Sequence, residues 1–306
     1  MPVPGVVGFG ALNMDKITLV DKIPSADEEG FVLSVECHPG GSAANTIVGL
    51  SRLGVRTGYI GRVGNDPEGS AMLKDLESEG VETRGIFLCQ GRSGVGLSFV
   101  DKRGQRALLI DPGVNDTISY RDLDWAYLRD FDLLHMTSFV CKSTDLSLQT
   151  QLALARDKDI PLSLDPGQLY AERGLQLLRP IVERCTVVLP NQRELRLMTG
   201  LGPVEGAKKL LGIGAKAVAV KMGLKGCYVT DGTTKEKVPA YGGRGVDTTG
   251  AGDAFNAGSI FGILAGMDLA ECGGIGAKVA WFCVQKVGAR AGLPTKRQLD
   301  ELADRR

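Results

Sequence analysis

The sequence has few of the residues that metal centres and disulfide-stabilised proteins need. It holds only two histidines, His38 and His135, and its seven cysteines are scattered without a C-x-x-C pair. These counts do not favour a His-based metal site, a Ser-His-Asp triad, a zinc site or a disulfide framework. We expect the cysteines to be buried free thiols in a reducing compartment.

An excess of charge and a long apolar run are also missing. Lys+Arg and Asp+Glu number 36 each, so the net charge is zero and gives no general reason to expect nucleic acid or an anionic membrane as a partner. The longest apolar stretches, such as 257–267, are shorter than the ~20 residues of a membrane-spanning helix, and the N-terminus lacks the pattern of a signal peptide. We therefore expect a cytoplasmic protein.

From about residue 130 onward, short apolar segments with strand character alternate with segments of helical periodicity. This alternation predicts an α/β fold with an open, mostly parallel sheet and helices on both faces. The length of 306 residues allows two domains, but a single domain over 1–306 with an insertion is typical of such sheets. Ligands bind at the carboxyl ends of parallel strands. The polar residues expected at those ends are Asp165, Asn191, Glu194, Lys221 and Asp247.

Segments within about 15–38 and 94–111 alternate apolar with polar residues, which predicts strands of a small sheet outside the main core. A thin sheet of this kind has one apolar face that needs a cover. We expect a ligand, a partner subunit or both to provide it.

The stretch 246–258 combines small residues with a carboxylate where a buried helix is expected to begin. Gly250, Ala251 and Gly252 would let a ligand approach the backbone, and the free N–H groups of the first helical turn form a site for a phosphate or an oxyanion. Asp253 beside that site fits a base that takes a proton from an attacking hydroxyl. The alternative is a glycine turn with an acidic residue that interacts with the helix dipole.

Two further segments present polar groups near turns. The opening strand delivers Asn13 and Asp15 at its end, and its glycines resemble a dinucleotide fingerprint only superficially, which argues against an NAD-dependent oxidoreductase. Gly40 and Gly41 open a helix that carries Asn45 one turn later, so these three could converge on a polar ligand. A satisfied core amide is the alternative for Asn45.

Taken together, residues 40–69 and 247–255 resemble the two signatures of the ribokinase-like (PfkB) carbohydrate kinases. Asn191 and Glu194 stand between them as an N-x-x-E element, and 221–226 as a nucleotide loop. The resemblance covers essentially the whole chain. It implies a ribokinase-like fold in which the small sheet forms a lid over the sugar and often a dimer contact, so we expect a homodimer.

The resemblance also assigns roles to single residues. Asp253 is implied as catalytic base, with Gly250, Ala251 and Gly252 as anion hole. The implied substrate residues are Asn13, Asp15, Gly40, Gly41 and Asn45. The implied nucleotide residues are Asn191, Lys221, Gly223, Gly226 and Thr248, although Lys221 could equally be a solvated lysine. Glu194 is implied to hold Mg²⁺ through water, and Asp247 with Thr249 a monovalent cation such as K⁺.

The activity implied by the resemblance is transfer of the γ-phosphate of ATP to a hydroxyl of a small, ribose-like sugar. Alternatives within the fold are a nucleoside kinase, a sugar-phosphate kinase and ADP as donor. Ser138 and Phe139 fall near the position of a ribokinase carboxylate, and Phe139 could either stack on a nucleobase or belong to the core. A lid arginine, Arg103 or Arg106, could receive a sugar phosphate. A non-catalytic sugar sensor is the alternative from another class.

Overall fold

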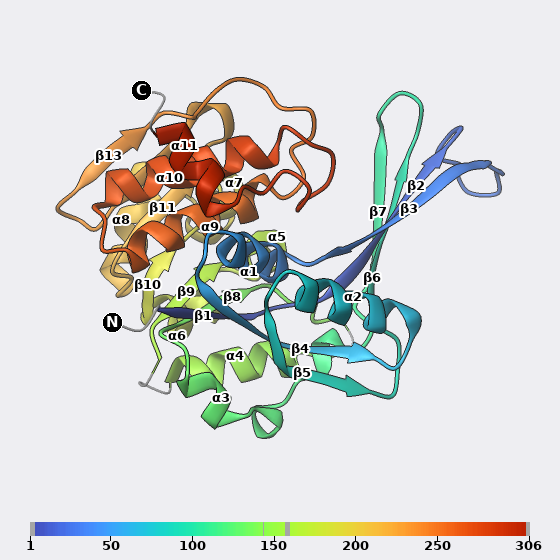
Figure 1. Cartoon of the computed structure of the whole chain (residues 1–306), viewed down its shortest axis with the longest axis horizontal. Helices are drawn as coiled ribbons and strands as arrows, with labels where there is room; N and C mark the ends of the chain where they lie inside the picture. The colour runs from blue at the N-terminus through green and yellow to red at the C-terminus, as the bar shows by residue number, and fades with distance from the viewer. Residues whose placement is uncertain (1–3, 143, 157–159, 304–306) are drawn as a thin grey trace.

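The computed structural model describes residues 4–142, 144–156 and 160–303, so the two ends of the predicted 1–306 domain lie outside the described residues. In this part of the chain the main element is a nine-stranded sheet (Figure 1). The strands lie in the order β13 (Lys235–Val238), β12 (Cys227–Thr230), β11 (Val218–Lys221), β10 (Cys185–Val188), β9 (Leu162–Asp165), β8 (Leu133–Thr137), β1 (Gly5–Phe9), β4 (Arg56–Gly64) and β5 (Glu82–Cys89).

Every neighbouring pair from β11 to β5 is parallel, and only β12 and β13 join antiparallel at one edge. The predicted open, mostly parallel sheet is therefore confirmed. Strand β5 was not predicted, because its sequence lacks a clear alternation of apolar and polar residues.

Helices cover both faces of the sheet, as predicted. One face is covered by α3 (Trp125–Arg129), α4 (Leu146–Arg156), α5 (Gly167–Arg173), α6 (Leu175–Val182), α7 (Gln192–Thr199) and α8 (Pro203–Ile213). The other is covered by α1 (Ser42–Arg52), α2 (Pro67–Ser78), α9 (Ala251–Leu264), α10 (Leu269–Cys283) and α11 (Lys296–Ala303).

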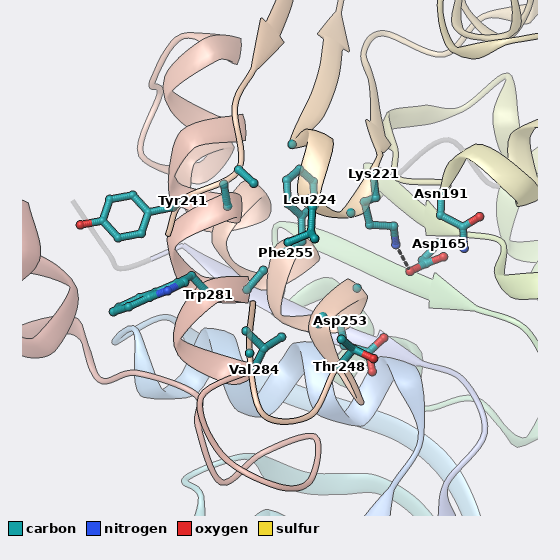
Figure 2. Close-up of a pocket in the computed structure, with 18 of the residues that line it drawn as sticks. Asp165, Asn191, Lys221, Leu224, Tyr241, Thr248, Asp253, Phe255, Trp281 and Val284 are labelled. Carbon is teal, nitrogen blue, oxygen red and sulfur yellow. Dashed lines mark hydrogen bonds and ion pairs between the residues drawn. The ribbon is translucent and has the colours of Figure 1, made fainter. Parts of the chain in front are cut away.

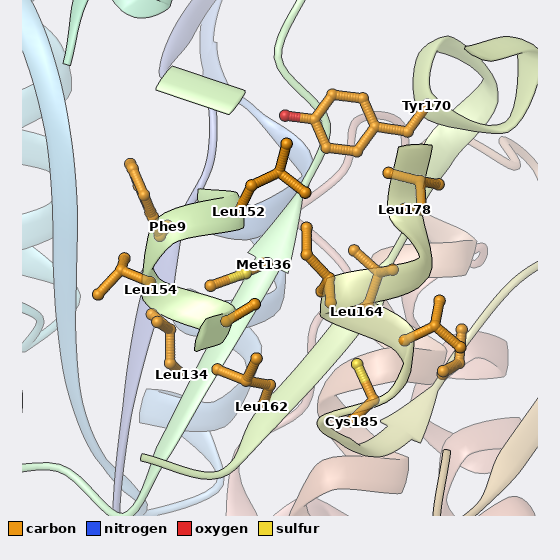
Figure 3. Packing of buried hydrophobic residues seen from close by; sticks show 14 of the residues in the cluster. Phe9, Leu134, Met136, Leu152, Leu154, Leu162, Leu164, Tyr170, Leu178 and Cys185 are labelled. Carbon is orange, nitrogen blue, oxygen red and sulfur yellow. The ribbon is translucent and has the colours of Figure 1, made fainter. Parts of the chain in front are cut away.

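Each face has its own hydrophobic core. Val6 and Val7 are adjacent on β1 and belong to different cores, since successive side chains of a strand point to opposite faces. A strand buried on both sides must be apolar at every position, which explains the continuous apolar runs of the central strands. Figure 3 shows the first core, where Leu134 and Met136 of β8 pack near Leu152 and Leu154 of α4.

A separate four-stranded sheet projects from this body (Figure 1). We call it the lid sheet; its order is β3 (Val32–Gly40), β2 (Asn13–Val20), β6 (Gly94–Val100) and β7 (Arg106–Asp111). The lid sheet begins earlier than predicted. Asn13 and Asp15 lie on β2 itself and not in a loop after β1, because Asn13 already pairs with Gly40 and Gly94.

All seven cysteines are free thiols, but not all are buried. The prediction of burial is wrong for Cys37, which is exposed on β3, and for Cys89 and Cys141, which are partly exposed. Among the described residues, no helix combines the length and the apolar character needed to cross a membrane.

Candidate active site

A cavity of about 450 Å³ opens at the carboxyl ends of the strands, where the sequence predicted a ligand site. It gathers many of the predicted residues from distant parts of the chain: Asn191, Glu194, Lys221, Gly223, Gly226, Thr248, Ala251, Gly252 and Asp253. In Figure 2, Tyr241 and Trp281 lie at one end of the cavity, and Asp165, Asn191 and Lys221 lie at the other.

The N-terminus of α9 forms part of the cavity wall. Gly250 caps the helix with a φ of 75°, a left-handed conformation that favours glycine, and no side chain caps the helix. Within the described part of the chain, the N–H groups of Gly252 and Asp253 have no protein acceptor. These free donors and the helix dipole can hold an anion.

The carboxylate of Asp253 lies directly beside these donors. Its Oδ2 accepts a hydrogen bond of 2.9 Å from Asn45 Nδ2. Desolvation raises the pKa of Asp253 to about 7, against the hydrogen bond from Asn45, while Asp165 raises the pKa further and Lys221 lowers it. A base with a pKa near the working pH is well placed to take up a proton.

Lys221 is buried and paired, so the prediction of a solvated lysine is wrong. Contact with the nucleotide phosphates, the other interpretation, stays a prediction. Lys221 Nζ donates to Asp165 Oδ2 at 2.6 Å and to Asn256 Oδ1 at 3.1 Å, and Asn256 Nδ2 also donates to Asp165 at 2.5 Å. Burial alone would raise the pKa of Asp165, but the ammonium of Lys221 holds it below its ordinary value. Both groups are therefore charged, and they form a buried ion pair beneath the anion site.

The Asn191 to Glu194 element begins helix α7 with reciprocal hydrogen bonds. Asn191 Oδ1 accepts from the Glu194 N–H at 2.9 Å, and Glu194 Oε2 accepts from the Asn191 N–H at 2.7 Å. The other carboxylate oxygen of Glu194 has no protein partner among the described residues, and its side chain lines the cavity. A single free carboxylate oxygen fits Mg²⁺, which keeps several of its waters.

Sequence reasoning missed the aromatic wall of the cavity. Tyr241 and Trp281 pack edge to face with ring centroids 5.3 Å apart, and Leu224 and Val284 extend the apolar surface. Tyr241 lies in the segment after β13, and Trp281 lies on α10, 40 positions further along the chain. No local pattern connects them.

The predicted acceptor residues lie on the lid side, outside the residues that line the cavity. Asn13 Oδ1 accepts from Asn115 Nδ2 at 2.9 Å. The carboxylate of Asp15 makes no hydrogen bond among the described residues, and burial raises its pKa against the charges of Arg290, Arg106 and His38. A Cβ at Gly40 would lie 2.2 Å from Asp15 Oδ2, so glycine is required for this close approach.

Asp247, Thr249 and Phe139 have structural partners. Asp247 Oδ1 accepts from the N–H and the hydroxyl of Thr249 at 2.9 and 2.8 Å, and Oδ2 accepts from the Gly288 N–H at 2.8 Å. Phe139 is fully buried and packs edge to face on Phe9, so it belongs to the core and not to a stacking site.

Comparison with known proteins agrees with this geometry. A family model described as pfkB family carbohydrate kinase matches residues 4–296. An uncharacterized sugar kinase of Archaeoglobus fulgidus is 46% identical over 247 residues, which cover 81% of this chain and 98% of the relative. An ATP-dependent ribose-1-phosphate kinase of Halopiger xanaduensis is 34% identical over 261 residues, or 83% of each chain. The crystal structure of a ribokinase from Thermotoga maritima has a TM-score of 0.88 at 24% identity and covers 99% of both chains.

The chain therefore belongs to the pfkB family of carbohydrate kinases. It is a sugar kinase of the ribokinase type, a phosphotransferase with a hydroxyl group as acceptor. The predicted ribokinase-like fold is confirmed.

Proposed function

We propose that the protein transfers the γ-phosphate of ATP to a hydroxyl of a small, ribose-like sugar. The observation that carries this proposal is the carboxylate of Asp253, with a pKa of about 7, beside the free N–H groups at the start of α9. Asp253 orients and deprotonates the acceptor hydroxyl, and the backbone of Gly250, Ala251 and Gly252 stabilises the charge on the transferring phosphoryl group.

ATP occupies the cavity in this proposal. The adenine ring of ATP lies toward Tyr241 and Trp281, and the phosphates lie toward Lys221, Asn191 and Thr248. Gly223 and Gly226 line the cavity after β11. Gly223 leaves room for the nucleotide, since nothing lies within 4 Å of a Cβ at this position, whereas a Cβ at Gly226 would meet the backbone of Val238. Glu194 would hold Mg²⁺ through water, and Mg²⁺ bound there would supply positive charge beside the phosphates. Asp247 and Thr249 remain our proposed residues for a monovalent cation.

The acceptor lies between the lid sheet and Asp253. Asn13, Asp15, Gly40, Gly41 and Asn45 contact its hydroxyls in this proposal. A carboxylate without a protein partner, such as that of Asp15, can accept hydrogen bonds from two vicinal hydroxyls.

An acceptor that carries its own phosphate is the second candidate, and Arg106 is the observation that favours it. Arg106 Nε donates to Ser98 at 2.9 Å, and its charge lowers the pKa of both Asp15 and Asp247. The charge of Arg106 thus acts on one carboxylate of the lid sheet and on one in residues 247–252, which lead into α9 and which we call the anion loop. Among the described residues the partner of Arg106 is the neutral Ser98 hydroxyl and not a carboxylate, so the guanidinium can receive a phosphate. One relative is a ribose-1-phosphate kinase.

We further propose a homodimer formed through the lid sheet, and a cytoplasmic location. Exposed Leu108 and Ile110 on β7 give one face of the lid an apolar surface that a second copy would cover. Seven free thiols fit a reducing compartment.

The test is an ADP-release screen of the purified protein with ribose, ribose 1-phosphate, fructose 6-phosphate, inositols and nucleosides as acceptors. ATP and ADP serve as donors in parallel, with AMP release followed for ADP. We expect turnover with ATP and one pentose derivative, and a loss of roughly 10²–10⁴-fold in kcat for Asp253→Asn with little change in ligand binding. Full turnover of Asp253→Asn would refute the mechanism, and binding without turnover would favour a sensor.

A further inference from the structure

Arg290 lies between α10 and α11 and belongs to none of the groups assigned above. Its side chain is only 10% exposed and makes three contacts with different elements. Nε donates to Asn45 Oδ1 at 2.8 Å, Nη1 forms an ion pair with Asp75 of α2, and Nη2 donates to the Gly40 carbonyl at 3.4 Å. A buried guanidinium with partners on each nitrogen holds a fixed position.

The backbone of Arg290 is fixed as well. Arg52 of α1 donates from Nη1 to the carbonyls of Arg290 and Leu293 at 2.8 and 3.1 Å. Arg52 is itself held by two hydrogen bonds to Glu79, of 2.8 and 2.6 Å. Two residues before Arg290, the Gly288 N–H donates to Asp247 of the anion loop. The segment is thus tied to both α2 and the active site.

The amide of Asn45 connects this arginine to the active-site carboxylate. Asn45 is 6% exposed, and its Nδ2 donates to Asp253 Oδ2 at 2.9 Å while its Oδ1 accepts from Arg290. An amide has one donor end and one acceptor end, whereas a guanidinium can only donate. Arg290 therefore requires the oxygen of Asn45 to face it, which directs the NH₂ group to Asp253.

We propose that Arg290 is a positioning residue for phosphoryl transfer, which fixes the amide of Asn45 so that it donates to Asp253. This inference rests on the proposed role of Asp253 as base. Without Arg290 the amide can rotate, and its oxygen would then face a carboxylate oxygen. That arrangement favours the protonated acid, which cannot accept the proton of the acceptor hydroxyl.

Several other groups face Asp253 and also influence its pKa. Ser42 and Asn45 approach from the start of α1, Asp165 from β9 and Lys221 from β11. Tyr59 of β4 and Cys283 of α10 also lie close enough to be affected by its charge. The charge of Arg290 also acts on Tyr59 and on Asp15 of the lid sheet. In the described structure, however, Asn45 alone joins Arg290 to Asp253 through hydrogen bonds, so the amide carries the positioning effect of Arg290 to the base.

The test is the pH profile of kcat and kcat/KM for Arg290→Met, which keeps an unbranched apolar stem and removes the donors. We expect kcat at pH 7 to fall roughly 10-fold or more, because a hydrogen bond to a charged group is no longer directed to the base. The acidic limb of the profile should move to higher pH by about one unit. Arg290→Lys restores one cationic donor and should return the limb toward that of the wild type.

Arg52→Met is the matched control. It removes a neighbouring arginine that holds the same segment but does not touch Asn45, so it should lower thermal stability without moving the acidic limb. A wild-type profile for Arg290→Met, or an equal shift for Arg52→Met, would overturn the inference. If Arg290→Met does not fold, the double variant Arg290→Met with Asp75→Asn, which leaves no unpaired carboxylate behind, takes its place. An unshifted profile with full kcat for that double variant would overturn the inference in the same way.

Asp253→Asn separates this inference from the proposed function. Full turnover of Asp253→Asn means that the base itself is wrongly assigned. Loss of turnover in Asp253→Asn with a wild-type profile in Arg290→Met means that only the positioning role is wrong.

Discussion

The chemistry at the residue scale depends on the protonation of one carboxylate. Asp253 opens to the cavity, yet desolvation and the charge of Asp165 raise its pKa to about 7, against the opposing effects of Asn45 and Lys221. The pKa values of the two carboxylates are shifted in opposite directions from the ordinary value of an aspartate, since Lys221 lowers the pKa of Asp165. The ion pair thus keeps Asp165 charged while Asp253 can exchange a proton near neutral pH.

The raised pKa of Asp253 predicts opposite trends for activity and stability. Turnover should fall as the pH drops below about 7, because the base becomes protonated. Stability follows the other sign: a carboxyl whose pKa is raised in the folded state contributes stability that is lost as pH rises toward 7. The difference in unfolding free energy between Asp253→Asn and the wild type should therefore shift in favour of the variant by roughly 1–3 kcal/mol between pH 5 and pH 8.

Urea unfolding at the two pH values measures this shift. Because Asp253 is partly exposed, we expect less than the full free energy that corresponds to the two pH units between pH 5 and its pKa of about 7. Asp247→Asn is a suitable control, because the pKa of Asp247 is lowered and its difference from the wild type should not move in this direction above pH 5. A difference for Asp253→Asn that does not depend on pH would contradict the raised pKa.

At the scale of elements, the two glycines of the anion loop have different roles: the fold requires Gly250, whereas the ligand requires Gly252. A Cβ at Gly250 would lie 2.6 Å from the backbone of Ala289, and its φ of 75° is unfavourable for other residues. A Cβ at Gly252 would contact the Lys221 side chain, whose nearest atom, Nζ, lies at the ordinary contact distance of 3.5 Å. Alanine therefore fits at Gly252 in the folded chain, but it would stand in the path of an approaching phosphate.

Gly250→Ala should lower the unfolding free energy by about 1–3 kcal/mol, the usual cost of strain at such a position. Gly252→Ala should keep near wild-type stability and still lose at least roughly 10-fold in kcat, because the methyl group displaces the phosphoryl group from the N–H donors. Thermal unfolding and steady-state kinetics on both variants check the two expectations. Equal activity of Gly252→Ala and the wild type would show that the phosphate does not bind this loop.

How much could be predicted from the sequence depends on the distance between the residues that interact. The start of α9 is a local pattern, so Gly250 to Asp253 could be identified from neighbouring residues. The alternation of strands and helices predicted the main sheet for the same reason. The contact between Arg290 and Asn45 joins residues 245 positions apart, and that between Asn45 and Asp253 spans 208. No spacing rule reaches that far, and the site is completed by the fold.

At the scale of the whole molecule, the lid sheet is the part that one chain leaves uncovered. Asp15 pairs with Gly96, which pairs with Ile110, and Ile17 pairs with Ser98, which pairs with Leu108. Paired residues share a face of a sheet, so Leu108 and Ile110 lie on the face that carries Asp15. Leu108 is 48% exposed and Ile110 is 42% exposed.

A second copy that packs on this face would bury the apolar side chains and close the acceptor site together. Under this proposal the wild type should be a dimer by light scattering after size exclusion, and Leu108→Asp with Ile110→Asp should give a monomer, because burying two unpaired carboxylates is costly. The monomer should also bind the acceptor more weakly, since no second copy closes the acceptor site. Leu197→Asp on α7 is the control, as Leu197 is similarly exposed at 43% but lies away from the lid. A monomeric wild type, or a double variant that stays dimeric, would show that something other than a second copy covers the lid.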